Sequence, residues 1–131
     1  MTPESILAAA DAVLLAAPPR GWLDCGLAAD LIIRRAGGVP PLGDVARVYE
    51  TPLQIFRRIR AHGGWRAHFA ATVEGNGYRR SAPQTGAVGF VRNDDGRFGH
   101  VVTVCAMPGL WIAPVQNGYT VLQKVDESWS Q

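Results

Sequence analysis

Apolar residues recur at helical spacing through the first half of the chain. Thr2 followed by Pro3 is typical of a helix start, with a side-chain cap and a proline at the first helical position. The mainly apolar run 6–16 then predicts the body of a first helix. Pro18 and Pro19 end this helix, because proline has no amide hydrogen for the helical hydrogen bond.

A second helix is predicted over residues 25–35. Leu27, Leu31 and Ile32 fall on one side of that helix and form its expected buried stripe. Two glycines at 37–38 supply the C-terminal stop, since glycine readily adopts the left-handed conformation that ends a helix.

The third predicted helix has the clearest start signal. Thr51-Pro52-Leu53-Gln54 forms a capping box with proline at the first helical position. Leu53, Phe56 and Ile59 follow on one face, and a pair of glycines ends the helix. Residues 72–82 are polar, contain glycine and show no clear period, so we expect a surface loop there.

The last third of the chain changes to short runs with strand character, joined by turn residues. Asn117-Gly118 is the strongest turn signal, because both residues accept the positive φ angles of a hairpin turn. Helices followed by hairpin-connected strands predict an α+β fold, with N-terminal helices packed on an antiparallel β-meander, in one domain over residues 1–131. The predicted strands are 87–91, 100–107, 110–114 and 119–125.

Composition fits one folded domain with little net charge. The chain has 131 residues, of which 47% are hydrophobic, and its formal net charge is +2. This balance argues against a strongly basic nucleic-acid-binding protein. The basic residues are almost all arginines, which favour bidentate contacts with anions. Their cluster at Arg57, Arg58 and Arg60 is interpreted first as a solvated helix face and second as an interaction surface.

The sequence implies neither a metal nor an organic cofactor. It has two cysteines and no C-x-x-C or Cys/His cluster that would indicate structural zinc. No apolar run approaches the ~20 residues of a membrane span. The N-terminus lacks the basic segment of a secretory signal, and Asp11 interrupts its alanine-rich stretch. We therefore expect a soluble domain without an export signal of its own.

Cys25 is the candidate nucleophile, because it lies where a loop becomes a helix. Amide groups and the helix dipole at that position favour a thiolate, and Gly26 leaves the approach to the sulfur open. The competing interpretation is a buried cysteine that acts as a small hydrophobe. Asp24 precedes it and is interpreted as a helix cap with a structural role.

His100 is the candidate general base, because it opens a predicted central strand that can face a helix N-terminus. Its competing interpretation is a half-buried strand histidine. His62 and His68 have a helix-end and loop context that favours solvated surface histidines. Cys105 lies on the opposite face of the strand from His100, so we expect it in the core, and a disulfide to Cys25 is improbable in a chain without a signal peptide.

These residues, taken in order, resemble the NlpC/P60 cysteine peptidases. Asp24-Cys25 opening a helix, Gly86-Ala87-Val88-Gly89-Phe90, and His100-Val101-Val102-Thr103-Val104 look like that family's Asp-Cys, Gly-Asp strand and histidine strand. A small phage-associated branch of the superfamily, known as a domain of unknown function in tailed phages and gene-transfer-agent-like elements, is more similar still. Residues 44–51, with Asp, Arg, Tyr and Thr, and Glu127-Ser128-Trp129 match that branch. The resemblance covers about residues 20–130.

The sequence departs from the family pattern around the nucleophile. Gly26 replaces the usual serine after the cysteine, Trp22 stands where a glycine is common, and Ala87 replaces the acidic residue of the strand start. The resemblance also implies a third polar residue about a dozen positions after the histidine. That position falls at Ile112-Ala113, so Gln116, with Asn117 beside it, is the nearest candidate to orient the histidine.

Four aromatic residues are candidates to line a groove for a sugar or peptide, although a core position is the more common one for aromatic side chains in small α+β domains. They are Trp22, Tyr49, Trp65 and Trp111.

The resemblance implies a cysteine hydrolase that cleaves peptidoglycan stem peptides, carried at a phage-like tail tip or hub among other tail proteins. Cys25 would be the nucleophile, His100 the base and Gln116 the orienting residue. Such a protein is made in the host cytoplasm and reaches its substrate on the virion. The alternative is a catalytically inactive structural or assembly component of the tail tip. A thiol acyltransferase or deamidase is a third hypothesis, because a Cys-His fold supports those reactions as well.

Overall fold

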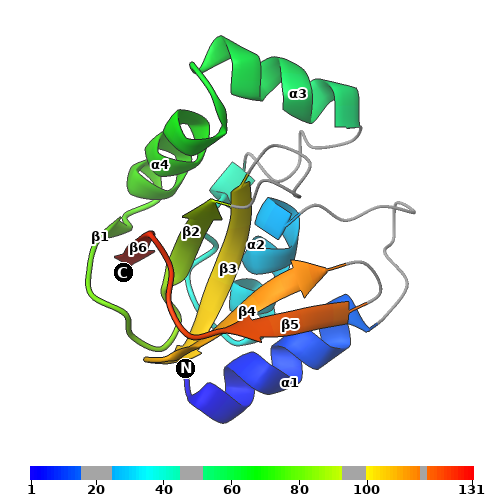
Figure 1. Ribbon diagram of the computed structural model, residues 1–131, viewed down its shortest axis with the longest axis vertical. Helices are drawn as coiled ribbons and strands as arrows, with labels where there is room; N and C mark the ends of the chain where they lie inside the picture. Colours follow the sequence, from blue (N-terminus) through cyan, green and yellow to red (C-terminus); the bar gives the residue numbers. More distant parts are fainter. Residues whose placement is uncertain (16–24, 45–51, 93–99, 116–117) are drawn as a thin grey trace.

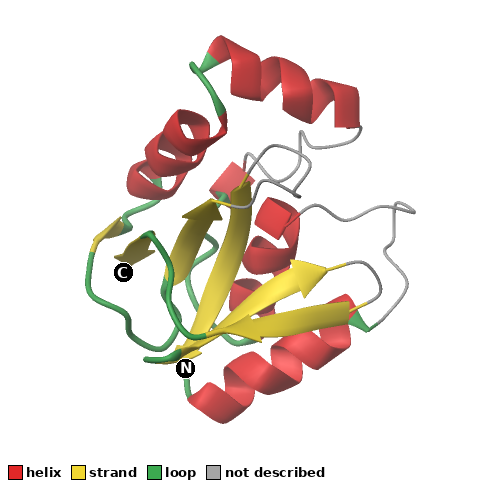
Figure 2. Ribbon diagram, viewed as in Figure 1, coloured by secondary structure: helices red, strands yellow, loops and turns green. Residues whose placement is uncertain are grey.

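The chain folds as helices packed against one antiparallel sheet, in a computed structural model that describes residues 1–15, 25–44, 52–92, 100–115 and 118–131 (Figures 1 and 2). In the described residues four helices precede all six strands, which confirms the predicted α+β class. The helices are α1 (Pro3–Leu14), α2 (Cys25–Arg35), α3 (Pro52–Ala61) and α4 (Trp65–Gly75). The strands are β1 (Arg79–Arg80), β2 (Val88–Arg92), β3 (His100–Met107), β4 (Leu110–Val115), β5 (Gly118–Leu122) and β6 (Glu127–Ser130).

The sheet extends the predicted meander at one edge. Its strand order is β1-β6-β2-β3-β4-β5, and every neighbouring pair is antiparallel. Strands β2 to β5 form the meander that the sequence predicts. The C-terminal strand β6 returns to pair with β2, and β1 pairs with β6. Sequence reasoning missed β1 and β6, because both depend on pairing between distant segments and β1 is only two residues long.

Helices α1, α2 and α4 cover one face of the sheet. Helices α1 and α2 pack on β3, while α4 lies over β2 and β6 through Phe69 (Figure 1). Side chains that alternate along β2 and β3 point into this layer, among them Phe90, Val102 and Val104, all buried. None of the helices in the described ranges is long and apolar enough to cross a membrane.

The first helix starts as predicted, and the buried stripes of the next two need correction. Thr2 and Ser5 cap α1 reciprocally, each side chain bonding to the other's backbone. In α2, Leu31 is 37% exposed, and Ile33 is buried instead. In α3, Leu53 is 56% exposed while Ile59 is buried. The structure does not describe Thr51 or the side chain of Phe56.

The surface loop predicted over residues 72–82 is wrong. Helix α4 continues to Gly75, and the chain then turns into β1 with Tyr78 fully buried. The cause is an apolar stripe at spacings of four residues, Trp65, Phe69 and Val73, which buries this helix against the core. Tyr78 donates a hydrogen bond from its hydroxyl to the backbone oxygen of Val39 at 2.6 Å, which satisfies the polar end of a buried ring.

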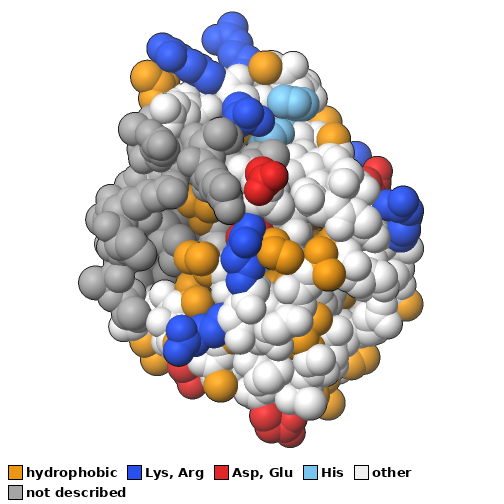
Figure 3. All heavy atoms as spheres, turned by 180° about the vertical axis from the view of Figure 1, so that it is seen from behind, with side chains coloured by type: hydrophobic (Ala, Val, Ile, Leu, Met, Phe, Trp, Pro, Cys, Tyr) orange, Lys and Arg blue, Asp and Glu red, His pale blue; other side chains and the backbone are white. Residues whose placement is uncertain are grey.

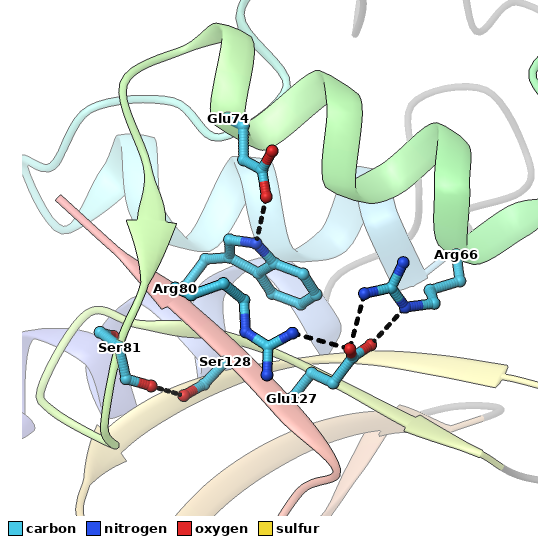
Figure 4. A network of polar contacts seen from close by, with 7 residues as sticks. Arg66, Glu74, Arg80, Ser81, Glu127 and Ser128 are labelled. Atoms are coloured by element: carbon cyan, nitrogen blue, oxygen red, sulfur yellow. Dashed lines mark hydrogen bonds and ion pairs between the residues drawn. The ribbon is translucent and has the colours of Figure 1, made fainter.

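Strand β6 is fastened to α4 and β1 by Glu127. Its carboxylate accepts two hydrogen bonds from Arg66 at 2.7 Å and one from Arg80 at 2.8 Å (Figure 4). The hydrogen bond from Arg66 is the largest cause that lowers the pKa of Glu127, although its partial burial opposes the shift. Both arginines are half exposed, so we expect the pairing to add little stability.

The face of the sheet away from the helices carries a small second cluster. Trp111 and Cys105 are buried there against Ala87, with Leu122 and Val125 packed over them. The connection from β5 to β6 crosses this face (Figure 1), and the Asp126 amide donates to the Phe90 oxygen at its end. This face is therefore partly covered by the chain itself.

Gly89 is required where β2 passes Trp111. A Cβ at Gly89 would lie 2.6 Å from Thr103 Oγ1 and 2.7 Å from a ring carbon of Trp111, both on buried side chains.

We predict that Gly89→Ala lowers the free energy of unfolding by about 1–3 kcal/mol, measured by urea denaturation. Gly75→Ala is the matched control, because nothing lies within 4 Å of its added Cβ. Equal stability of the two variants would contradict this close contact.

Candidate functional site

Cys25 begins α2 and lies against β3. Its Sγ accepts a hydrogen bond from the Val102 amide at 3.2 Å, and the half-buried side chain packs on the main core. This amide comes before the segment of β3 that pairs with β4, which runs from Val104 to Met107. Figure 1 shows β4 diverging from β3 at the end where α2 begins. The thiol therefore meets a backbone donor of β3 at the point where the two strands separate.

His100 is the first residue of β3 and lies near the same end of the α2–β3 contact. It is opposite Arg92 on β2, and alternation along the strand puts it on the face of Val102, which is the helix-facing side. Its ring stacks on Phe90 with the centroids 4.6 Å apart and an interplanar angle of 21°. The structure thus places the candidate base two positions along β3 from the amide that binds the Cys25 sulfur.

Cys105 has the opposite environment, as predicted. It is fully buried on the other face of β3, and burial raises the pKa of its thiol to about 11. Cys25 and Cys105 are not joined in a disulfide. Only Cys25 has a position at a helix start, which is the feature that favours a thiolate.

The predicted third polar residue falls in a part of the chain that the structure does not describe. Gln116 and Asn117 lie outside the described residues, as do Asp24, Trp22 and Tyr49. The pair Ile112-Ala113, where the resemblance predicted that residue, is buried and apolar, so its side chains accept no hydrogen bond.

Trp65 and Trp111, the two described candidates for a groove lining, belong to the core instead. They are 5% and 0% exposed. The described groove lies elsewhere, on the sheet face away from the helices, with a volume of about 240 Å³. Val91, Val101, Ala113 and other residues of β2 to β5 line it, and Cys25 and His100 do not. This groove is across the sheet from the candidate site.

The arginine cluster of α3 is a solvated face, in line with the first interpretation. Arg57 and Arg60 are exposed and Arg58 is half-buried. Figure 3 shows Lys and Arg side chains gathered at the end of the molecule where α3 lies. Helix α3 packs mainly on α4, which leaves this side of it in solvent.

Two features of the site have no signal in the sequence alone. The Val102 amide contacts Cys25 because α2 packs on β3. The Phe90 ring contacts His100 because of the register of β2 on β3. Neither residue type indicates chemistry by itself. Within the described ranges, no group of three or more His, Cys, Asp or Glu is placed to hold a metal ion.

Comparisons with protein-family models, with curated proteins and with solved structures found no match to this chain.

The prediction that His68 is a solvated surface histidine is wrong. His68 is 1% exposed on α4, whereas His62 is exposed with its ring 4.9 Å away. Burial, followed by the nearby His62 and Arg58, lowers the pKa of His68 to about 4. The error follows from the missed helix α4, which turns this residue inward.

We predict that His68 makes the fold acid-sensitive. His68 takes up a proton near pH 6.5 in the unfolded chain, but only near pH 4 in the folded chain. The free energy of unfolding is therefore highest above pH 6.5 and decreases as the pH falls toward 4. His68→Gln should flatten the fall in unfolding free energy between pH 7 and pH 5, measured by urea denaturation. His62→Gln, the exposed control, should keep most of that fall. A wild-type slope in His68→Gln would refute the assignment.

Proposed function

We propose that this chain is a cysteine hydrolase of the NlpC/P60 type, with Cys25 as the nucleophile and His100 as the general base. The observation that carries the proposal is the hydrogen bond from the Val102 amide to Cys25 Sγ, since it puts the first residue of α2 on the strand that begins with His100. A helix start and a backbone donor both favour the anionic form of a sulfur. A histidine on the same face of that strand can take the thiol proton.

The proposed reaction has two steps. In the first, His100 accepts the proton of the Cys25 thiol while the sulfur attacks the scissile carbonyl carbon, and the same proton then goes to the leaving amine. The product is a thioester on Cys25. In the second step a water molecule gives a proton to His100 and attacks the thioester, which releases a carboxylate and restores the thiol. The backbone amide of Cys25 is the candidate donor to the oxyanion, because it lies at the helix start.

The substrate and the location are proposed from the family resemblance. NlpC/P60 enzymes act on peptide bonds of peptidoglycan, and the phage-associated branch implies a place at a tail tip or hub with other tail proteins. The virion would carry the domain to the cell wall during genome delivery. The half-exposed thiol of Cys25 supports a reactive role, because a cysteine used only for packing is more often fully buried, as Cys105 is.

The second candidate is a structural tail component that keeps the fold without turnover. The apolar pair at Ile112-Ala113, where the family carries its orienting residue, favours this alternative. The two candidates differ in the chemistry of one atom, Cys25 Sγ, so they are separable by experiment. A transferase or deamidase would share the activated thiol and differ only in the acyl acceptor or in the amide that is attacked.

We predict that Cys25 alkylates faster than an ordinary thiol at mildly acidic pH. Iodoacetamide labelling of the folded chain, followed by intact mass from pH 5 to 9, should show a Cys25 rate at pH 6 on the order of ten times that of a free thiol. His100→Ala should return the profile to that of a free thiol. Cys105→Ser is the control and should leave it unchanged, because Cys105 is buried on the other face.

Hydrolysis is the second part of this test. Purified peptidoglycan fragments incubated with the wild type should lose a stem-peptide bond, and Cys25→Ala should abolish that cleavage. An inert Cys25 across neutral pH in the folded chain would contradict the proposal and favour the structural alternative. A reactive Cys25 without cleavage would contradict the substrate assignment and retain the nucleophile.

A further inference from the structure

We propose that Phe90 is a positioning residue for His100, holding the imidazole ring by stacking where the family uses a polar side chain. This inference rests on the proposed function of the Cys25–His100 pair. The two rings are 4.6 Å apart between centroids and within 21° of parallel. They belong to neighbouring strands, because Phe90 is opposite Val102 and is therefore the diagonal neighbour of His100 on the same face.

Phe90 is itself fixed on its other side. It is 2% exposed, and its ring stacks on Phe69 of α4 at 5.4 Å and 18°. Trp65, one turn before Phe69, lies 6.4 Å from the Phe90 ring. A ring held between α4 and His100 cannot rotate without opening the core, so it offers His100 a rigid surface.

The column of rings continues to the C-terminal strand. Phe69 meets Trp129 edge to face at 5.5 Å. The Trp129 indole nitrogen donates to Glu74 of α4 at 3.0 Å, and the Arg80 guanidinium lies 5.1 Å from its ring centroid (Figure 4). These contacts form an aromatic column that joins the candidate site to strand β6. Its members are His100, Phe90, Phe69 and Trp129.

Stacking can orient a histidine without a polar partner. The strand fixes the direction of the Cα–Cβ bond, and the Phe90 face then fixes the ring plane, which restricts the two side-chain torsions χ1 and χ2. Both ring nitrogens lie in that plane, so the stack leaves their hydrogen bonds in place.

The test compares two changes of equal size in the same column. Phe90→Leu removes the ring that stacks on His100, and Phe69→Leu removes the ring that stacks on Phe90. Both variants should lose stability in urea denaturation. Only Phe90→Leu should slow Cys25 alkylation at pH 6, on the order of ten-fold, and move its pH profile toward that of a free thiol. Phe90→Tyr keeps the aromatic face and should restore the wild-type profile.

A second readout does not depend on Cys25 being reactive. The ring protons of His100 should show ring-current shifts in NMR spectra, and Phe90→Leu should remove these shifts while Phe69→Leu keeps them. A wild-type alkylation profile in Phe90→Leu, or an equal change in both leucine variants, would overturn the positioning role. Ring-current shifts with an inert Cys25 would overturn the proposed function and leave the stack as packing only.

Discussion

The candidate site depends on the packing of α2 against the first half of β3. There the Val102 amide donates to Cys25 Sγ, before β3 begins to pair with β4. A hydrogen-bonded sheet normally uses its amides on neighbouring strands, and an amide left over at the point of divergence needs another acceptor. The sulfur of the first helical residue supplies it. The same contact fixes the start of α2 at the end of the strand that carries His100.

The two faces of β3 give its neighbouring cysteines different chemistry. On the helix-facing side, Cys25 is half-buried at a helix start and His100 lies near it on the strand. On the other side, Cys105 is enclosed with Trp111, and burial raises the pKa of its thiol to about 11. Strand alternation puts His100 and Cys105 on opposite faces of β3, and α2 brings Cys25 to the face of His100. The rings of Phe90 and Phe69 then connect His100 to α4 on the helix-facing side.

The elements that the sequence predicted well depend on local signals. The strand over 100–107 lies between turn residues, and the cap at Thr2 needs only its own next residues. The wrong predictions concern features that depend on tertiary contacts between distant segments. Helix α4 was missed although its apolar stripe is present, and His68 was therefore assigned to the surface. The stack of Phe90 on His100 depends on the exact register of β2 on β3. A hydrophobic pattern predicts which residues form strands, but it does not predict that register to the residue.

The most direct test is whether the Cys25 side chain and the His100 ring are in contact in solution. The measurement is the set of nuclear Overhauser effects from the ring protons of His100 to the β protons of the two cysteines, with Cys105, buried on the other face of β3, as the control. The proposed pair predicts cross-peaks from the His100 ring to Cys25 and none to Cys105. A His100 ring without a cross-peak to Cys25 would contradict the pairing on which the proposed hydrolase depends.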